Sequence, residues 1–225
     1  MSTASTEPRD GRSTRWDPHR RERRLSIINA AIAAIEEHGP DVLTGQIAEH
    51  ARVPRTHVYR HFDGKSALDL AVSTHVANQI GQRIRAGLAS GGSAREIIHG
   101  AIDEHLRWVE AHPNLYRFLA QHAYAMRDRG EGSSARDAKA ALAEELTGLV
   151  ARYMSVLGAD PEPAERLIVG VVGLVDATAA WWLDHPQLLR PTISAELADQ
   201  VWLLLDRTAR SLGLHIDPDQ ALPPI

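Results

Sequence analysis

The chain has no cysteine among its 225 residues. This absence excludes disulfide bonds, thiol nucleophiles and thiolate metal sites together, and it is consistent with a reducing cytoplasm. The common signatures of catalysis are missing as well. There is no HExxH metal motif, no Gly-x-Ser-x-Gly elbow and no Gly-rich phosphate loop. We therefore expect a protein that is not an enzyme, with no metal site and no cofactor.

Long apolar runs are also missing. No stretch approaches the roughly 20 apolar residues that span a bilayer, and the Ser/Thr/Arg-rich N-terminus lacks the apolar segment of a secretory signal. We expect a cytoplasmic protein with no membrane partner. We interpret residues 1–16 as a disordered basic arm; the alternatives that this arm touches DNA or has no role both stay open.

No segment shows the alternation of a β-strand, whereas apolar residues recur every three or four positions along most of the chain. The sequence therefore predicts an all-α fold of about nine helices. Asp17 and Pro18 suit the cap and first position of the first helix. The predicted ranges are 18–38, 45–51, 54–61, 65–89, 94–111, 114–128, 134–157, 162–184 and 193–213, followed by a disordered tail over 214–225.

Charge is distributed unevenly along the chain, although the net charge is only -4. Residues 1–24 hold seven arginines against four acidic residues, a net of +3, whereas residues 71–225 hold 14 basic residues against 19 acidic ones, a net of -5. A basic end on an acidic body indicates a protein whose anionic partner docks at one end.

The stretch from Thr44 to Leu68 carries the groups that could bind such a partner. A short helix, a tight turn and a second short helix form the helix-turn-helix plan. Arg55, Thr56 and His57 begin the second helix, where base contacts are made, while groups that suit phosphates follow: Tyr59, His61 and Lys65. The alternative is two packed helices with a solvated polar face.

The order of residue types in this stretch resembles the DNA-binding motif of the TetR family of transcriptional regulators. The pattern is IAxxAxV, then VYRHF, then KxxL, and the resemblance covers about residues 20–75. It implies a helix-turn-helix domain over 17–64 and a helical effector-binding and dimerisation domain over 65–213. It also implies that Ile47, Ala48 and Val53 are core, and that Thr44 and Gln46 lie near the DNA backbone.

Three positions depart from the family's pattern. Arg52 stands where the family has Gly, at a position that can require a left-handed backbone. Pro54 replaces a serine that would cap the next helix through its side chain. His57 replaces a small residue, so the preferred half-site cannot be taken from relatives.

A single helix-turn-helix reads few base pairs, so the resemblance implies a homodimer on a palindromic operator. We expect its interface on the two apolar helices 162–184 and 193–213, where small residues permit close approach. The alternative is that these faces are ordinary core within one chain. The predicted interface residues are Val169, Gly170, Gly173, Ala177, Leu197, Val201, Leu204 and Leu205.

The middle helices carry aromatic and polar side chains of the kind that line a small-molecule pocket. The predicted effector-pocket residues are Trp108, Tyr116, Phe118, His122, Tyr124, Met126, Tyr153 and Trp181. Each could equally be plain core. As a group they favour a small apolar effector, such as a fatty acyl or polycyclic compound, that releases a repressor from its operator. The alternative is a ligand-independent helical DNA-binding or adaptor protein.

Overall fold

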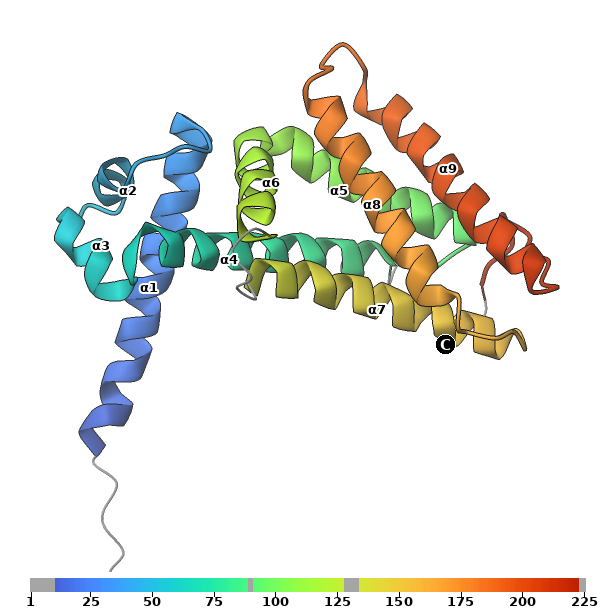
Figure 1. The fold of residues 1–225 in the computed structure, drawn as a ribbon, viewed down its shortest axis with the longest axis horizontal. Helices are drawn as coiled ribbons and strands as arrows, with labels where there is room; N and C mark the ends of the chain where they lie inside the picture. Colours follow the sequence, from blue (N-terminus) through green and yellow to red (C-terminus); the bar gives the residue numbers. More distant parts are fainter. Residues whose placement is uncertain (1–10, 89–90, 128–133, 223–225) are drawn as a thin grey trace, which may run out of the picture.

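The computed structural model describes residues 11–88, 91–127 and 134–222, with their side chains except those of 11–18, 122–127 and 134–139. Within these ranges the backbone forms nine helices and no β-strand (Figure 1). This confirms the predicted all-α fold. The helices are α1 (Gly11–His38), α2 (Thr44–His50), α3 (Arg55–His61), α4 (Gly64–Leu88), α5 (Ala94–Ala111), α6 (Pro113–Arg127), α7 (Ser134–Val156), α8 (Ala164–Leu183) and α9 (Arg190–Ser211).

Helix α1 begins at Gly11, so the predicted start with Asp17 as cap and Pro18 as first residue is wrong. Pro18 has no backbone N–H, and the helix continues through it with one hydrogen bond fewer. Arg15 precedes the proline by three residues and Arg20 and Arg21 follow it, and arginine is a good helix former. The expected disordered arm 1–16 is therefore helical over residues 11–16, and residues 1–10 lie outside the described ranges.

Helices α1, α2 and α3 form a small head at one end of the molecule (Figure 1). Its core joins apolar side chains from all three helices, each no more than 3% exposed: Ile27, Ile35, Ile47, Val58 and Phe62. Because α2 and α3 have only seven residues each, most of their stability comes from this shared core and little from their own backbone hydrogen bonds.

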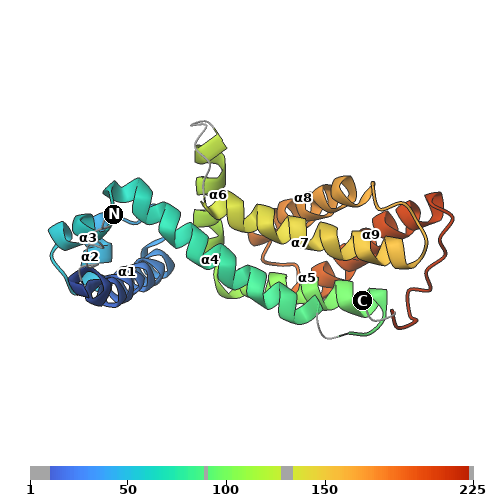
Figure 2. The same cartoon turned by 90° about the horizontal axis from the view of Figure 1, so that it is seen from below.

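Helix α4 leaves the head and runs into the larger helical body (Figures 1 and 2). There it packs against α5 and α7, while α5 also packs against α9, and α8 lies between α7 and α9. Buried residues of α4 recur at spacings of four: Leu68, Val72 and Val76. A single helix thus shares its buried face with both parts of the molecule.

The head and the body also meet at a second place, the end of α1 against the corner between α5 and α6. Asn114 donates a hydrogen bond from Nδ2 to the Glu36 carbonyl oxygen at 2.9 Å. His112 Nδ1 lies 2.6 Å from Glu36 Oε1, and the Trp108 ring packs beside the His112 ring. We call this contact of Glu36 with His112 and Asn114 the α1 clamp.

The tail predicted to be disordered is instead held against the start of α5 over residues 214–222. The Leu222 N–H donates to the Gly92 carbonyl oxygen at 3.0 Å, and the Arg95 N–H donates to the Pro218 carbonyl oxygen at 3.2 Å. Arg95 also lies 3.3 Å from the Asp219 carboxylate. These bonds join residues far apart in sequence, which is why helical periodicity did not reveal them. Residues 223–225 lie outside the described ranges.

Helix α8 is less buried within the chain than its composition predicts. Only Ala164, Ile168, Ala179 and Trp182 are buried, although an almost wholly apolar helix was expected to be covered on more than one face. By length and composition α8 could cross a bilayer, with 17% of the apolar window buried, which corrects the expectation that no stretch is apolar enough. A helix that meets a partner protein passes the same test.

Candidate nucleic-acid interface

The turn between α2 and α3 contains the left-handed residue that the sequence predicted. Arg52 has φ of 52° and is the only non-glycine residue with positive φ in the described ranges. The Arg52 N–H donates to the Glu49 carbonyl oxygen at 3.0 Å, and the Val53 N–H donates to the Ala48 carbonyl oxygen at 3.0 Å. This pair of bonds is the Schellman motif, in which glycine is the usual left-handed residue.

Replacing Arg52 by Gly should stabilise the protein, because a side chain in the left-handed region costs roughly 1–2 kcal/mol. Part of the gain is offset by the greater freedom of glycine in the unfolded chain. We expect the melting temperature of Arg52→Gly to rise by about 2–4 °C. Arg52→Ala removes the guanidinium but keeps the strain, so it should show no rise. An equal rise in both variants would assign the effect to the arginine side chain instead.

Helix α3 starts one residue later than predicted, at Arg55, with Pro54 as its N-cap. Pro54 makes no side-chain cap hydrogen bond, as expected from the loss of serine at this position. The Pro54 carbonyl oxygen instead accepts from the His57 N–H at 2.8 Å. Val58 and Phe62 face the core, which leaves the opposite side of the short helix exposed.

One flank of α3 joins the start of α2 through Tyr59. Its hydroxyl donates to Thr44 Oγ1 at 3.4 Å and accepts from the Arg55 guanidinium at 3.3 Å. The hydrogen bonds with Thr44 and then Arg55 lower the pKa of Tyr59 from its ordinary value. Thr44 is itself 6% exposed, while the Gln46 side chain accepts from the Leu43 N–H at 2.8 Å. Thr44 and Arg55 therefore lie together around one phenol, whereas Gln46 caps the start of α2.

The other flank of α3 carries His57, Arg60 and His61. Arg60 Nη1 lies 3.1 Å from His57 Nε2, and the two imidazole rings meet edge to face with centroids 6.4 Å apart. Arg60 is exposed and lies two residues after buried Val58, so it points away from the head's core. The prediction omitted Arg60 from the contact residues, although its place between two chosen residues offered the signal.

The pKa of His61 is lowered from its ordinary value, first by burial and then by the nearby His57, Arg20 and Arg60. His61 is therefore neutral in the free protein at pH 7. A DNA phosphate would favour the imidazolium, so binding takes up a proton. DNA affinity should thus rise as the pH falls from 7.5 through the pKa that His61 has in the DNA complex. It should level off below the pKa that His61 has in the free protein. The slope of log K for DNA binding against pH should reach about one proton per chain.

His61→Gln tests this pH dependence in a DNA titration between pH 5.5 and 7.5. The variant should lose affinity mainly at the acidic end, because the wild-type imidazole is neutral at the alkaline end. His99→Gln, which changes an exposed histidine on α5 outside the head, is the matched control and should keep the pH dependence of the wild type. If His61→Gln keeps the whole pH dependence of the wild type, the proton is taken up by another group.

Lys65, predicted as a phosphate contact, stands at the start of α4 with Nζ 2.6 Å from Asp69 Oδ1. Its side chain is 32% exposed and that of Asp69 only 9%. The aspartate therefore holds the ammonium at the edge of the head beside α3. A phosphate would share this cation with a carboxylate, which weakens the contact relative to a free lysine.

Arg24 lies on α1, within the predicted first helix, and it positions α3. Its guanidinium donates to the His61 carbonyl oxygen at 2.6 Å and lies 4.1 Å from the centre of the Phe62 ring. A cation at the end of a helix satisfies a free carbonyl and opposes the helix dipole. Arg24 thus fixes the end of α3 against α1, a contact across 37 positions that no local pattern predicts.

The predicted effector pocket is largely core in the described part of the chain. Trp108 and Phe118 are 4% and 0% exposed, and the Tyr116 hydroxyl donates to the Asp176 carbonyl oxygen at 3.0 Å. Trp181, in contrast, is 48% exposed and stacks on His185. Tyr153 is partly buried. The side chains of His122, Tyr124 and Met126 lie outside the described ones.

Two open hollows lie elsewhere. One, of about 440 Å³, lies between α1 and α4. The other, of about 350 Å³, lies at the end of α7. Neither is lined by a predicted pocket residue. The aromatic side chains therefore do not surround either hollow, because those that are described and buried pack against neighbouring helices.

The predicted interface residues divide into an exposed group and a buried one. Leu197 and Val201 are 1% and 3% exposed, so their assignment to the interface is corrected: they fill the core between α9 and α5. Leu205 is partly buried against that core. The exposed residues, which we call the α8–α9 strip, are Val169, Gly170, Gly173, Ala177 and Trp181 on α8 and Leu203 and Leu204 on α9.

Two family models match the chain. One, described as "Tetracyclin repressor-like, C-terminal domain", matches residues 83–214. The other, described as "Bacterial regulatory proteins, tetR family", matches residues 27–72. The second match contains the head's helix-turn-helix, and the first contains most of the helical body.

Individual proteins agree with these models. The chain is 31% identical over 207 residues to an uncharacterized HTH-type transcriptional regulator of Mycobacterium tuberculosis, covering 89% of this chain and 83% of that one. A tetR-family regulator from Streptomyces coelicolor has a similar fold, with a TM-score of 0.69, 19% identity and coverage of 85% and 83%. FadR from Bacillus subtilis, solved with stearoyl-CoA, gives a TM-score of 0.58, 20% identity and coverage of 80% and 96%.

Proposed function

This chain belongs to the TetR family of bacterial transcriptional regulators, and we propose that it is a homodimeric, ligand-responsive repressor of a palindromic operator. The family consists of DNA-binding regulators, not enzymes. We place the protein in the cytoplasm with its DNA. The finer features of this proposal rest on the geometry of the head, the exposed faces of α8 and α9, and the link between head and body.

The observation that carries the proposal is the grouping of DNA-compatible side chains on the free side of α3. Arg55, Thr56 and Arg60 are exposed there. We assign them, with His57, to base edges in a major groove, where arginine can bind guanine bidentately. We assign the backbone phosphates to the residues on the flanks of that face: Thr44, Gln46, Tyr59, His61 and Lys65.

Dimerisation through the α8–α9 strip would place two heads on one duplex. Val169 and Leu203 are 62% and 63% exposed in the single chain, which is unusual for side chains of this size when several lie on neighbouring helices. A methyl group added at Gly170 or Gly173 would meet nothing within 4 Å in the chain itself. Packing within one chain therefore does not require glycine there, whereas a helix from a second copy approaching closely would.

We propose a small apolar effector with a fatty acyl chain as its first candidate. The support is the fold shared with FadR of Bacillus subtilis, which was solved with stearoyl-CoA. Effector binding in the body would move α6 or α4, and both of these helices reach the head. Release of the operator then requires only that the effector bind better to a form in which the two heads no longer match their half-sites.

A ligand-independent regulator is the second candidate. It is favoured by the tight burial of Trp108 and Phe118, which leaves the predicted pocket filled by the chain's own side chains. The two candidates differ in one measurable property, because only the first predicts that an acyl compound changes the affinity for DNA.

Selection of bound duplexes from a random pool tests the DNA-binding part of the proposal. We expect a palindrome whose half-sites are centred about 34–36 Å apart or a multiple of this spacing. The recovered operator is then titrated with and without palmitoyl-CoA and stearoyl-CoA. A loss of about 5–150-fold in affinity supports the effector class; unchanged affinity supports the ligand-independent candidate. Recovery of no common sequence would contradict both.

A further inference from the structure

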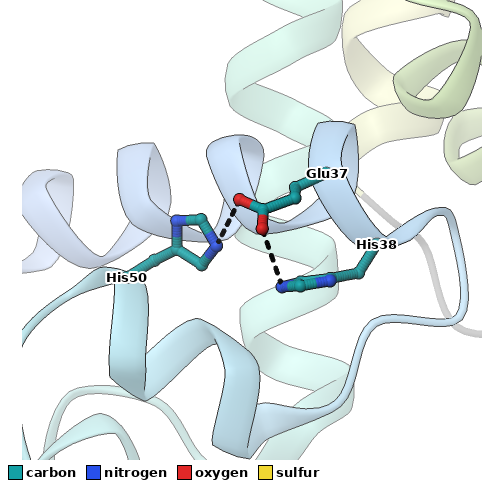
Figure 3. A group of neighbouring side chains, drawn as sticks. All are labelled: Glu37, His38 and His50. Atoms are coloured by element: carbon teal, nitrogen blue, oxygen red, sulfur yellow. Dashed lines mark ion pairs between the residues drawn. The ribbon is translucent and has the colours of Figure 1, made fainter.

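Two histidines and a glutamate meet at the corner where α1 ends and α2 ends (Figure 3). Glu37 and His38 are the last two residues of α1, and His50 is the last residue of α2. Glu37 Oε2 lies 3.4 Å from His50 Nε2, and Glu37 Oε1 lies 3.9 Å from His38 Nε2. The three possible ligand atoms lie within 4.8 Å of one another.

We propose that Glu37, His38 and His50 form a binding site for one Zn²⁺ ion, which ties the end of α1 to the end of α2. Neutral imidazole nitrogen and carboxylate oxygen are ligands that zinc takes together, at about 2.0–2.2 Å. In a tetrahedral site, ligand atoms at about 2.1 Å from the metal lie about 3.4 Å apart. The spacings at this corner therefore need only a small further closure.

The side chains are free to make that closure. They are 63%, 30% and 24% exposed for Glu37, His38 and His50 respectively, and the two imidazole rings meet edge to face with centroids 5.6 Å apart. Rotation about the side-chain bonds can bring the nitrogens toward a common point without moving either helix. Three protein ligands leave the fourth position of a tetrahedral ion to water.

The three residues stand at the ends of their helices, where the backbone carries the negative end of the helix dipole. The last carbonyl groups of α2 accept hydrogen bonds from the turn that follows, so the main negative charge at this corner is the Glu37 carboxylate.

Zinc at this corner would act on the DNA-binding head. His50 is followed directly by the turn that contains left-handed Arg52, and this turn determines where α3 starts. Glu36, the neighbour of Glu37, belongs to the α1 clamp. An ion at the corner would hold α2 to α1 beside both features. The sequence predicted no metal site because His38 and His50 lie on different helices, and only the fold brings them together.

The test is titration of tag-free, chelator-treated full-length protein with ZnCl₂ by calorimetry, together with thermal unfolding. We expect one high-affinity ion per chain and, at a hundredfold excess over Kd, a rise in melting temperature of roughly 5 °C or more. EDTA should reverse the rise. Because no DNA is present, the result does not depend on the function proposed above.

Three variants test whether the zinc ion binds at this corner. His38→Ala, His50→Ala and Glu37→Gln should each weaken zinc binding at least about 10–100-fold, the loss that even an outer partner of a ligand causes. His99→Ala, which changes an exposed histidine on α5, is the matched control and should bind like the wild type. His38→Ala and Glu37→Gln change exposed side chains, so they keep the test informative if His50→Ala fails to fold. No binding, or binding that all three variants retain, would overturn the proposal.

Discussion

Val169→Glu should convert the proposed dimer into a monomer and lower operator affinity by at least about 100-fold. The Val169 side chain is 62% exposed on α8, so a glutamate there is harmless in an isolated chain. In the proposed dimer, each copy would bring one carboxylate into an apolar contact. The effective penalty for removing an unpaired charge from water is several kcal/mol per ion, and both copies bear it.

Val156→Glu is the matched control, because Val156 is 60% exposed at the end of α7 and is not part of the α8–α9 strip. It should remain dimeric and bind DNA normally. Leu204→Glu, on α9, tests the strip independently and should behave like Val169→Glu. Sedimentation measures the oligomeric state, and a gel shift with the selected operator measures affinity. A fully active dimer from both strip variants would place the interface elsewhere.

Tyr59→Phe should lower operator affinity by at least about 100-fold while leaving its salt dependence unchanged. The Tyr59 side chain is 41% exposed, and its hydroxyl contacts to Thr44 and Arg55 are long, at 3.3–3.4 Å. A DNA phosphate can therefore replace them. A hydrogen bond to a charged group contributes about 1.5–3 kcal/mol, and a dimer loses two of them. No counterion release is lost, because phenol carries no charge.

Two variants separate this effect from general damage to the head. Thr44→Val removes the partner within the protein and the phosphate contact proposed for Thr44, but it keeps the phenol. Because Thr44 is only 6% exposed, this variant should lose less affinity than Tyr59→Phe. Lys65→Gln should reduce the slope of log K against log salt by about 1.8 for the dimer, since each neutralised phosphate contributes about 0.9. If Tyr59→Phe binds the operator as tightly as the wild type and has the same melting temperature, the Tyr59 hydroxyl does not contact DNA.

The sequence predicted helices well because the helical period is local. The spacing of Leu68, Val72 and Val76 determined the buried face of α4, and the structure has the same face. The left-handed turn at Arg52 was also predictable, since the family that the sequence resembles has glycine at this position.

The sequence could not predict which partner each apolar helix face packs against. Helix α9 has apolar residues on two faces, and its period alone cannot say which one meets α5. The structure buries Leu197 and Val201 and exposes Leu203 and Leu204. Contacts between distant residues were equally invisible, such as Arg24 on the end of α3 and the tail on Gly92. Each depends on the three-dimensional path of the chain.

The α1 clamp gives the head a second support, with a mechanical consequence. A head attached to the body through α4 alone could twist and tilt about the axis of this helix. A second attachment, away from α4, restricts these motions and fixes a point about which the head can rotate. Glu36 is attached to the corner of α5 and α6, so in the proposed dimer a small shift of this corner would rotate the α3 helix of each chain. The distance between the two α3 helices would then depend on the packing of the body as well as on the stiffness of α4.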